Sequence, residues 1–177
     1  MSPTFDLILK GGNVATPGGI AVADVAVTGG RIAGVGSFDA SQAGEVFEAS
    51  GLHVLPGVID SQVHFREPGL DHKECLETGM MAAAMGGITG IFEMPNTNPL
   101  TITPETFADK MARAAKGAWT DYAFYFGGTA QNAKNLPEWE NLPGVCGIKI
   151  FMGSSTGDLL VASDEDVEAV VANGKRV

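Results

Sequence analysis

A chain of 177 residues has room for one ordinary domain or two small ones, and its hydrophobic content of 45% excludes a disordered or fibrous protein. Eleven basic against 21 acidic residues give a net charge of −10. Such a charge repels the phosphates of nucleic acids and the head groups of anionic lipids. The composition therefore predicts a globular protein that binds neither nucleic acid nor a membrane surface.

The two cysteines and the amino terminus indicate a compartment. Cys75 and Cys146 have no C-x-x-C spacing, and two cysteines are too few for a disulfide framework in a domain of this size. We interpret both as buried thiols. The first residues lack the pattern of a signal peptide, and no apolar run reaches membrane-spanning length. These features predict a cytoplasmic protein.

Residues 1–55 alternate short β-rich runs with glycine pairs. The runs are 5–10, 24–28 and 31–35, and the glycine pairs are 11–12 and 29–30. This pattern predicts a small antiparallel sheet with turns at the glycines. The rhythm changes after Leu55-Pro56-Gly57, which predicts a domain boundary that separates 1–55 from 56–177.

From residue 56 onward, strands alternate with helix-length segments, as in parallel βα units. The predicted strands are 57–64, 88–94, 122–126 and 147–152. The first helix is expected to open at Asp71, with Glu74 completing a capping box, and to close at the glycines 86–87. The second is expected to start at Pro104 behind the N-cap Thr103 and to end at Gly117.

The end of the chain completes the predicted fold. A glycine-rich loop at 153–157 leads to a helix capped by Ser163, with Asp166 three residues later, and 175–177 resembles the start of a fifth strand. The fold class is therefore α/β: a truncated (β/α)8 TIM-type barrel, about its first four βα units, preceded by a small β-sandwich portion. A whole barrel takes about 250 residues. An open half-barrel exposes strand edges and an apolar sheet face.

A doubly wound α/β domain is the alternative fold. The chain has no Gly-x-Gly-x-x-Gly fingerprint after any predicted strand, which argues against that reading.

The first predicted barrel strand has polar residues at alternate positions in an otherwise apolar run. Because a strand repeats every two residues, these side chains point to one face. The polar positions are Asp60, Gln62, His64 and Arg66. They lie toward the carboxyl end of the strand, where barrel enzymes assemble their sites. His64 is accordingly a candidate metal ligand, with a hydrogen-bonded core histidine as the alternative.

Lys149 lies inside the apolar run 148–152, where a charged ammonium is costly to bury without a partner. Burial lowers the pKa of a lysine and favours the neutral amine. A neutral amine can capture carbon dioxide as a carbamate, whose two oxygens can bridge two divalent cations. The alternative is a lysine that reaches solvent or pairs with an acid such as Asp60.

Arg66 and Asn96 are candidates for binding a small anionic substrate. Arg66 offers a planar fork of donors that suits a carboxylate, and Asn96 offers an amide at the mouth of the second strand. The alternatives are an ion pair of Arg66 with Glu67 or Asp71, and an Asx turn at Asn96 ahead of a proline.

Three motifs occur in order along the chain: residues 56–69 (PGVIDSQVHFREPG), 94–99 (MPNTNP) and 147–151 (GIKIF). With them the chain resembles the amino-terminal part of a dihydroorotase of the amidohydrolase superfamily, more than the related hydantoinases and allantoinases. The resemblance implies a hydrolase that interconverts carbamoyl aspartate and dihydroorotate in pyrimidine biosynthesis and uses one or two zinc ions. It also implies a small β-sandwich beside the barrel.

The resemblance assigns roles to particular residues. His64 matches the second histidine of the family's His-x-His motif, Lys149 matches its carboxylated lysine, and Arg66 and Asn96 match groups that bind the substrate carboxylate. Gln62 stands where the family has the first histidine. The family's later histidines and its catalytic aspartate are expected beyond Val177. No catalytic residue is therefore expected within these 177 residues, which we expect to be inactive alone.

Two further hypotheses stay open, and Gln62 motivates the first. A glutamine is a poor replacement for an imidazole that binds zinc, so the chain is alternatively an inert dihydroorotase-like subunit that scaffolds aspartate transcarbamoylase. A hydantoinase- or allantoinase-type hydrolase is the other alternative. In either case we expect a homo-oligomer.

Overall fold

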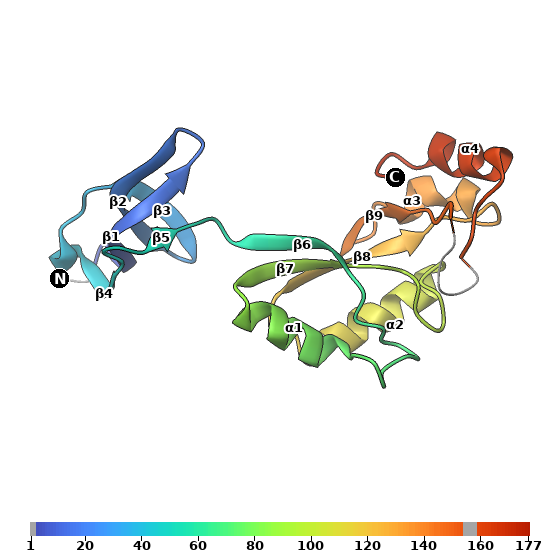
Figure 1. Ribbon diagram of the computed structural model, residues 1–177, viewed down its shortest axis with the longest axis horizontal. Helices are drawn as coiled ribbons and strands as arrows, with labels where there is room; N and C mark the ends of the chain where they lie inside the picture. Colours follow the sequence, from blue (N-terminus) through green and yellow to red (C-terminus); the bar gives the residue numbers. More distant parts are fainter. Residues whose placement is uncertain (1–2, 154–158) are drawn as a thin grey trace. The chain divides into compact units, whose positions relative to one another are not determined.

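The computed structural model describes residues 3–153 and 159–177. The chain divides into two compact units, Met1–Pro56 and Gly57–Val177. This division lies one residue beyond the boundary that the change in sequence pattern predicts. Figure 1 shows the first unit in blue to cyan and the second from turquoise, at β6, to red.

The first unit is a single sheet of five strands with the order β3-β2-β1-β4, in which β5 also pairs with β1. The strands are β1 (Phe5–Thr16), β2 (Gly19–Thr28), β3 (Arg31–Gly36), β4 (Ala43–Glu48) and β5 (His53–Val54), and a 3-10 turn η1 (Ala40–Gln42) precedes β4. Strands β1 to β3 are antiparallel, as predicted, whereas β4 and β5 run parallel to β1. The prediction of a purely antiparallel sheet was wrong because the link through η1 brings β4 back alongside β1.

The glycine pair 11–12 is a bulge within β1 and not the predicted turn. The register of β1 on β2 shifts between Leu9 and Gly12, and Gly11 has a φ of +70°. The buried carboxylate of Asp24 accepts the Gly11 N–H at 2.8 Å and the Lys10 ammonium at 2.7 Å. The bulge is held by this side chain, which lies on the next strand. The glycine pair 29–30 does form the predicted turn, between β2 and β3.

The second unit contains a curled sheet of four parallel strands in the order β6-β7-β8-β9. The strands are β6 (Val58–Val63), β7 (Ile88–Glu93), β8 (Asp121–Gly127) and β9 (Val145–Lys149). The helices are α1 (Leu76–Met85), α2 (Pro104–Ala114), the 3-10 turn η2 (Ala133–Asn135), α3 (Leu136–Trp139) and α4 (Asp164–Asn173). Strand and helix alternate along the chain (Figure 1). The prediction of a truncated barrel of about four βα units is confirmed.

The core lies between the helices and one face of this sheet. It joins α1 and α2 to the strands through Met80, Phe107, Phe124 and Phe126, all of them buried. The rings of Phe107 and Phe126 stack with their centroids 4.8 Å apart. Each fully buried side chain of this size contributes about 1.5–3 kcal/mol to folding. The core therefore holds α1 and α2 against the sheet.

The edge strand β6 is largely uncovered, as expected of an open half-barrel. Val58 and Ile59 are 51% and 57% exposed. The strand ends at Val63, and its register on β7 shifts twice. The strict alternation predicted through Arg66 is therefore wrong, because His64 and Arg66 already lie in the loop that follows.

Two of the predicted helix starts are confirmed. Thr103 caps α2, and its hydroxyl and that of Thr106 form a reciprocal capping box. Ser163 caps α4 by accepting the Asp166 N–H at 3.2 Å. In both cases the cap is local, so the sequence alone was sufficient to place it.

The predicted start of the first helix at Asp71 was wrong, because α1 begins at Leu76. Cys75 occupies the N-cap position without a side-chain hydrogen bond. The missing acceptor is supplied by Glu67, whose Oε2 accepts the Leu76 N–H at 2.9 Å. An acceptor nine residues upstream lies outside any local capping pattern.

The last part of the chain differs from the prediction in two places, and a third prediction there is not tested. Strand β9 ends at Lys149, so 150–152 lie beyond it, apart from a single bridge between Phe151 and Leu160. The predicted loop at 153–157 lies outside the described residues after Gly153. Residues 175–177 form no strand, although the Arg176 carbonyl accepts the Ile148 N–H at 2.7 Å and so lies along β9.

Neither cysteine is fully buried, which corrects the interpretation of both as buried thiols. Cys75 and Cys146 are free and intermediate in exposure. Across residues 3–153 and 159–177, no helix has the length and apolar character needed to cross a membrane.

Candidate functional site

Two of the sequence motifs form one structural unit at the carboxyl ends of β6 and β7. The Met94 N–H donates to the Val63 carbonyl at 3.0 Å, and the Asn98 N–H donates to the Pro68 carbonyl at 2.9 Å. These bonds join the loop after β6 (residues 64–70) to the loop after β7 (residues 94–101). The two loops follow neighbouring parallel strands, so both emerge at the same edge of the sheet.

Gly69 permits the closest approach between these loops. Its φ of +86° lies in the left-handed region, and a β-carbon at this position would collide with the carbonyl oxygen of Asn98. A glycine is therefore required at this point of the Arg-Glu-Pro-Gly motif for both space and backbone conformation.

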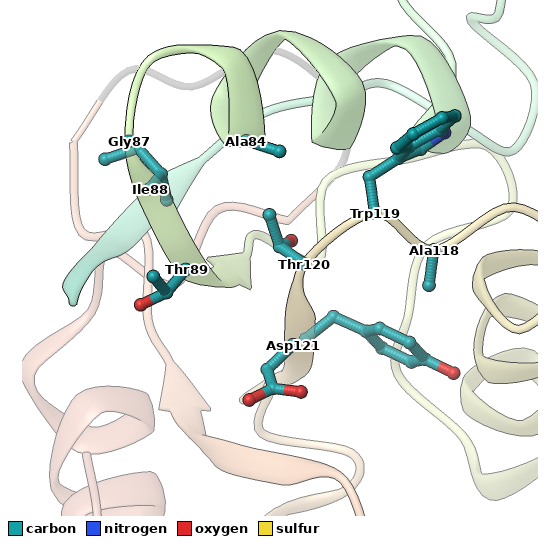
Figure 2. Close-up of a pocket in the computed structure, with 9 residues that line it drawn as sticks. Ala84, Gly87, Ile88, Thr89, Ala118, Trp119, Thr120 and Asp121 are labelled. Atoms are coloured by element: carbon teal, nitrogen blue, oxygen red, sulfur yellow. The ribbon is translucent and has the colours of Figure 1, made fainter. Parts of the chain in front are cut away.

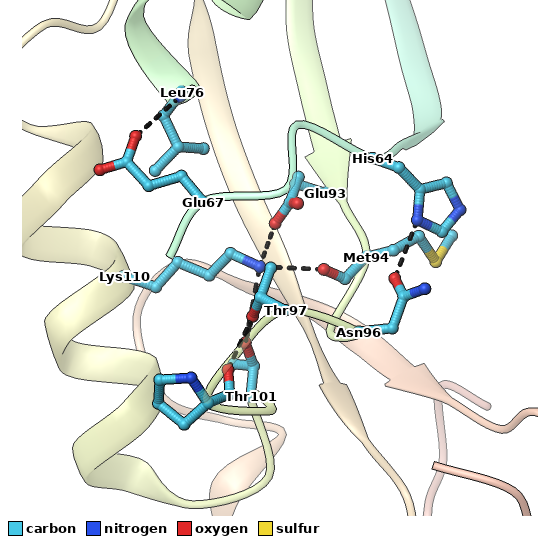
Figure 3. Close-up of polar contacts among 10 residues, drawn as sticks. His64, Glu67, Leu76, Glu93, Met94, Asn96, Thr97, Thr101 and Lys110 are labelled. Carbon is cyan, nitrogen blue, oxygen red and sulfur yellow. Dashed lines mark hydrogen bonds and ion pairs between the residues drawn. The ribbon is translucent and has the colours of Figure 1, made fainter. Parts of the chain in front are cut away.

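His64 and Asn96 meet across the two loops. Nδ1 of His64 lies 2.8 Å from Oδ1 of Asn96 (Figure 3). An amide oxygen only accepts, so the ring donates its Nδ1–H, and a neutral ring then keeps the lone pair on Nε2. Asn96 is 6% exposed and His64 is partly buried. The contact fixes the tautomer and the orientation of the imidazole.

The surroundings of His64 favour its neutral form. Burial lowers the pKa of the imidazole, and the positive charges of Arg66, Lys110 and Lys149 lower it further, against the opposing effect of the bond to Asn96. A neutral imidazole with a free Nε2 suits metal binding or proton acceptance.

Arg66 holds a backbone conformation that is unusual for a residue with a side chain. Its φ is +69°, and its carbonyl accepts the Leu70 N–H at 3.1 Å. Such conformations cost of order 1–3 kcal/mol and are concentrated at functional sites. Within the described residues, Arg66 makes neither of the ion pairs considered as alternatives; Glu67 instead lies near Arg113, at 3.5 Å.

Lys149 is the last residue of β9 and is half-buried. Its neighbour Ile148 packs into the helix-facing core, so Lys149 points toward the opposite face of the sheet. The ammonium lies 5.3 Å from the centre of the Phe151 ring. No ion pair with Asp60 occurs among the described residues. The amine is thus at the carboxyl edge of the sheet, with partial access to solvent.

The side chains at and near His64 meet the requirements of a metal ion only in part. His64 fits the role of a ligand, because Asn96 holds its other ring nitrogen. Gln62 is exposed and offers a neutral amide, which zinc disfavours, and its backbone N–H bonds to Asp60 at 3.0 Å. Over the described part of the chain, no three histidine, cysteine or acidic side chains form a metal-binding group. The described residues therefore do not form a complete metal site.

A buried ion pair beneath the two loops was missed by the sequence analysis. Glu93 and Lys110 are 1% and 0% exposed and form an ion pair (Figure 3). Two signals in the sequence indicate it. Glu93 interrupts the apolar run that ends β7, and Lys110 lies on the same helical stripe as Phe107 and Ala114. When each of two apolar faces carries one charged residue of opposite sign, the two residues are expected to form an ion pair.

A cavity in the second unit lies away from these loops. It measures about 680 Å³ and lies at the amino ends of β7 and β8 (Figure 2). Its walls include Ile88, Trp119 and Asp121. Barrel enzymes place their chemistry at the opposite, carboxyl edge, so this cavity is not the candidate site.

The geometry agrees with a comparison against protein families. The model described as "Dihydro-orotase-like" matches residues 51–140, which is half of the chain. The chain belongs to the Dihydro-orotase-like family. The matched stretch contains His64, Arg66 and Asn96 together with the Glu93–Lys110 pair, whereas Lys149 lies outside it.

Curated members of known name are similar over most of this chain. An allantoinase of Escherichia coli (strain SMS-3-5 / SECEC) is 44% identical over 163 residues, which are 91% of this chain and 35% of the relative. An allantoinase of Desulfitobacterium hafniense (strain Y51) is 41% identical over 148 residues, which are 83% of this chain and 33% of the relative. The chain spans about a third of the length of these relatives.

Solved structures give the same family resemblance. The L-hydantoinase (dihydropyrimidinase) from Arthrobacter aurescens matches with a TM-score of 0.85 and 33% identity, over 94% of this chain and 37% of that one. A dihydropyrimidinase from Brevibacillus agri NCHU1002 matches with a TM-score of 0.78 and 27% identity, again over 94% and 37%. The L-hydantoinase and the dihydropyrimidinase thus share the half-barrel fold with this chain.

Proposed function

We propose that the chain is the amino-terminal part of a hydrolase that opens cyclic amides, and that it supplies the substrate-binding half of the site. The hydrogen bond between His64 and Asn96 carries this proposal, because it brings two of the motifs together at the carboxyl edge of the sheet. The named relatives support the class, since allantoinases and hydantoinases both open cyclic amides.

The residues of this chain would act mainly by binding and orientation. Arg66 pairs with an anionic group on the substrate, while Asn96 orients the ring of His64. His64 and Lys149, if carboxylated, are the proposed ligands for a divalent zinc ion that later residues of the full-length protein help to hold. Such an ion supplies a hydroxide near neutral pH and polarises the amide carbonyl.

The proposed substrate is a cyclic amide with a carboxylate, and dihydroorotate is the candidate of that kind. Arg66 favours it, because a guanidinium matches a carboxylate in two hydrogen bonds, and the matched family model is dihydro-orotase-like. Allantoin or a hydantoin is the second candidate, which the curated allantoinases and the solved hydantoinases favour. Neither ring carries a carboxylate.

An assay of the full-length protein with dihydroorotate, allantoin and hydantoin tests both the proposed reaction class and the proposed substrate. We expect ring opening of at least one substrate. Arg66→Met should raise KM only for an anionic ring, and Arg31→Met, an exposed arginine of the first unit, is the matched control. If none of the three rings is opened, the proposed class is wrong.

A non-catalytic role is the second candidate function, and Gln62 favours it. Glutamine at a ligand position weakens metal binding, and the proposal is then a subunit that scaffolds aspartate transcarbamoylase. Co-purification of the two proteins, together with absence of bound zinc and of turnover, is the expected result. Zinc-dependent turnover would exclude this role.

A further inference from the structure

The ammonium of Lys110 is held by groups from three different segments. Besides the Glu93 carboxylate, Nζ contacts the carbonyl oxygen of Met94 at 2.9 Å and the hydroxyl of Thr101 at 3.5 Å (Figure 3). It also lies 5.3 Å from the centre of the Phe124 ring. The ammonium thus contacts the strand end, the helix-facing core and both ends of the loop 94–101.

The loop between Met94 and Thr101 is the segment that carries Asn96. Its interior is closed by the Thr101 N–H, which donates to the Pro95 carbonyl at 2.9 Å, and by the Thr97 hydroxyl, which donates to the Pro99 carbonyl at 2.9 Å. These bonds are internal to the loop. Backbone bonds also tie it to its surroundings, among them the Gly127 N–H of β8, which donates to the Thr101 carbonyl at 2.8 Å. Lys110 supplies an attachment at each end, from a helix that the core holds in place.

Stability does not explain the choice of a charged pair at this position. Removing two charges from water costs several kcal/mol per ion, and an apolar pair of similar volume is often at least as stable. What an apolar pair cannot provide is a donor for the Met94 carbonyl. The directional contact is therefore the property that distinguishes this pair from a packed core.

We propose that Lys110, held by Glu93, is a positioning residue that fixes the loop 94–101 so that Asn96 orients His64. The proposal rests on the proposed function only for its catalytic consequence. Lys110 contacts no substrate. It acts through the backbone of Met94, two residues before Asn96.

The orientation of His64 can be observed directly by nitrogen NMR of the imidazole. Selective ¹⁵N-histidine labelling of the full-length protein, freed of metal by a chelator so that no ion holds Nε2, gives the signal, and a His64→Gln variant assigns it. The measurement is made above the ordinary imidazole pKa of about 6.5, where the ring is neutral and the tautomer decides the spectrum. The wild-type protein should show one tautomer with a protonated Nδ1, as the bond to Asn96 requires.

The decisive variant in the full-length protein is the double substitution Glu93→Gln/Lys110→Met. It leaves no unpaired buried charge and removes the donor to Met94, so we expect a folded protein whose His64 signal shows mixed tautomers. We also expect kcat/KM to fall by about 10-fold or more, as for loss of a group that orients a ligand. The exposed control Lys116→Met should keep the wild-type signal and the wild-type kcat/KM.

A double variant that folds and keeps the wild-type tautomer would overturn the proposal. If the double variant does not fold, Glu93→Gln/Lys110→Leu decides, because it is a second pair without charge that also lacks the donor to the Met94 carbonyl; an unchanged His64 signal would then refute the positioning role. The NMR signal does not depend on hydrolysis. A protein that opens no ring but shows the expected change would refute the proposed function and leave the positioning role intact.

Discussion

His64 donates a hydrogen bond to Asn96 although the two residues are 32 positions apart. They become neighbours because β6 and β7 are adjacent parallel strands and both loops emerge at one edge. The Met94 and Asn98 amides then bond to the first loop, so two separate motifs form a single substructure. The order of the motifs along the chain thus reflects one arrangement in space.

Asn96→Ala tests the role of this contact. Without the amide, the His64 ring loses its partner and the proposed site loses a polar group, so kcat/KM of the full-length protein should fall by about 10- to 100-fold. Steady-state kinetics measure the effect. Asn141→Ala changes an exposed asparagine and should leave the rate unchanged. Equal rates for both variants would contradict the assignment of Asn96 to the site.

Gln62→His tests the departure from the family's metal motif. Zinc prefers imidazole nitrogen to an amide oxygen, so the variant should bind zinc at least about 10-fold more tightly than the wild type. Competition with a chelating dye measures the affinity. The same change at another exposed glutamine, Gln131→His, controls for adventitious binding. No difference between the two variants would place Gln62 outside the metal site.

Gly69→Ala should destabilise the second unit more than Gly87→Ala does. Both glycines have a φ near +87°, and either substitution incurs the left-handed penalty of about 1–2 kcal/mol. Only Gly69 faces a close neighbour, the Asn98 carbonyl, whereas nothing lies within 4 Å of a β-carbon at Gly87. Chemical denaturation gives both free energies of unfolding. Similar losses of stability for the two variants would show that the loops 64–70 and 94–101 can move apart to accommodate a β-carbon at position 69.

Glu67→Ala should weaken the start of α1. The substitution removes the acceptor of the Leu76 N–H, and loss of such a cap costs about 0.5–2 kcal/mol. Arg113→Met removes the partly exposed ion pairs with Glu67 and Asp109 and leaves the cap, so its cost should stay below about 1 kcal/mol per pair. Thermal unfolding compares the two. A larger loss of stability for Arg113→Met than for Glu67→Ala would contradict the capping role, because the ion pairs of Arg113 would then matter more than the bond from Glu67 to Leu76.

The stability of the protein should depend on pH through Glu93. Burial raises the pKa of this carboxyl from 4.5 to about 7, against the opposing effect of Lys110. An acid with a raised pKa binds more protons in the folded state, so its contribution is fully present below about 4.5 and is lost as pH rises through about 7. The free energy of unfolding, measured across this range, should therefore decline less in Glu93→Gln. Parallel curves for wild type and variant would contradict the raised pKa.

Local patterns predicted those elements whose signals are themselves local. The caps at Thr103 and Ser163 and the turn at the glycine pair 29–30 are all set by residues within a few positions, and all were found. The start of α1 failed because its acceptor, Glu67, arrives through the fold. The bulge at Gly11 failed for the same reason, since its partner Asp24 lies on the next strand.

The candidate site shows the same difference between local signals, which the sequence contains, and contacts that form only on folding. His64, Arg66, Asn96 and Lys149 were identified by residue type and position at strand ends. The sequence did not show that Asn96 faces the His64 ring, nor that the Glu93–Lys110 pair lies below the loop. A charged residue in an apolar stripe indicates that a partner exists, but not which of the other charges is the partner.

By itself, the sequence determined the class of fold and the set of chemical groups, because hydrophobic period and residue type act over short distances along the chain. Tertiary structure alone decided which of those groups meet. Contacts between loops depend on which strands pair and on how far each loop is held from the sheet, and no local pattern contains that information. The meeting of His64 with Asn96 above a buried lysine is therefore a property of the folded half-barrel.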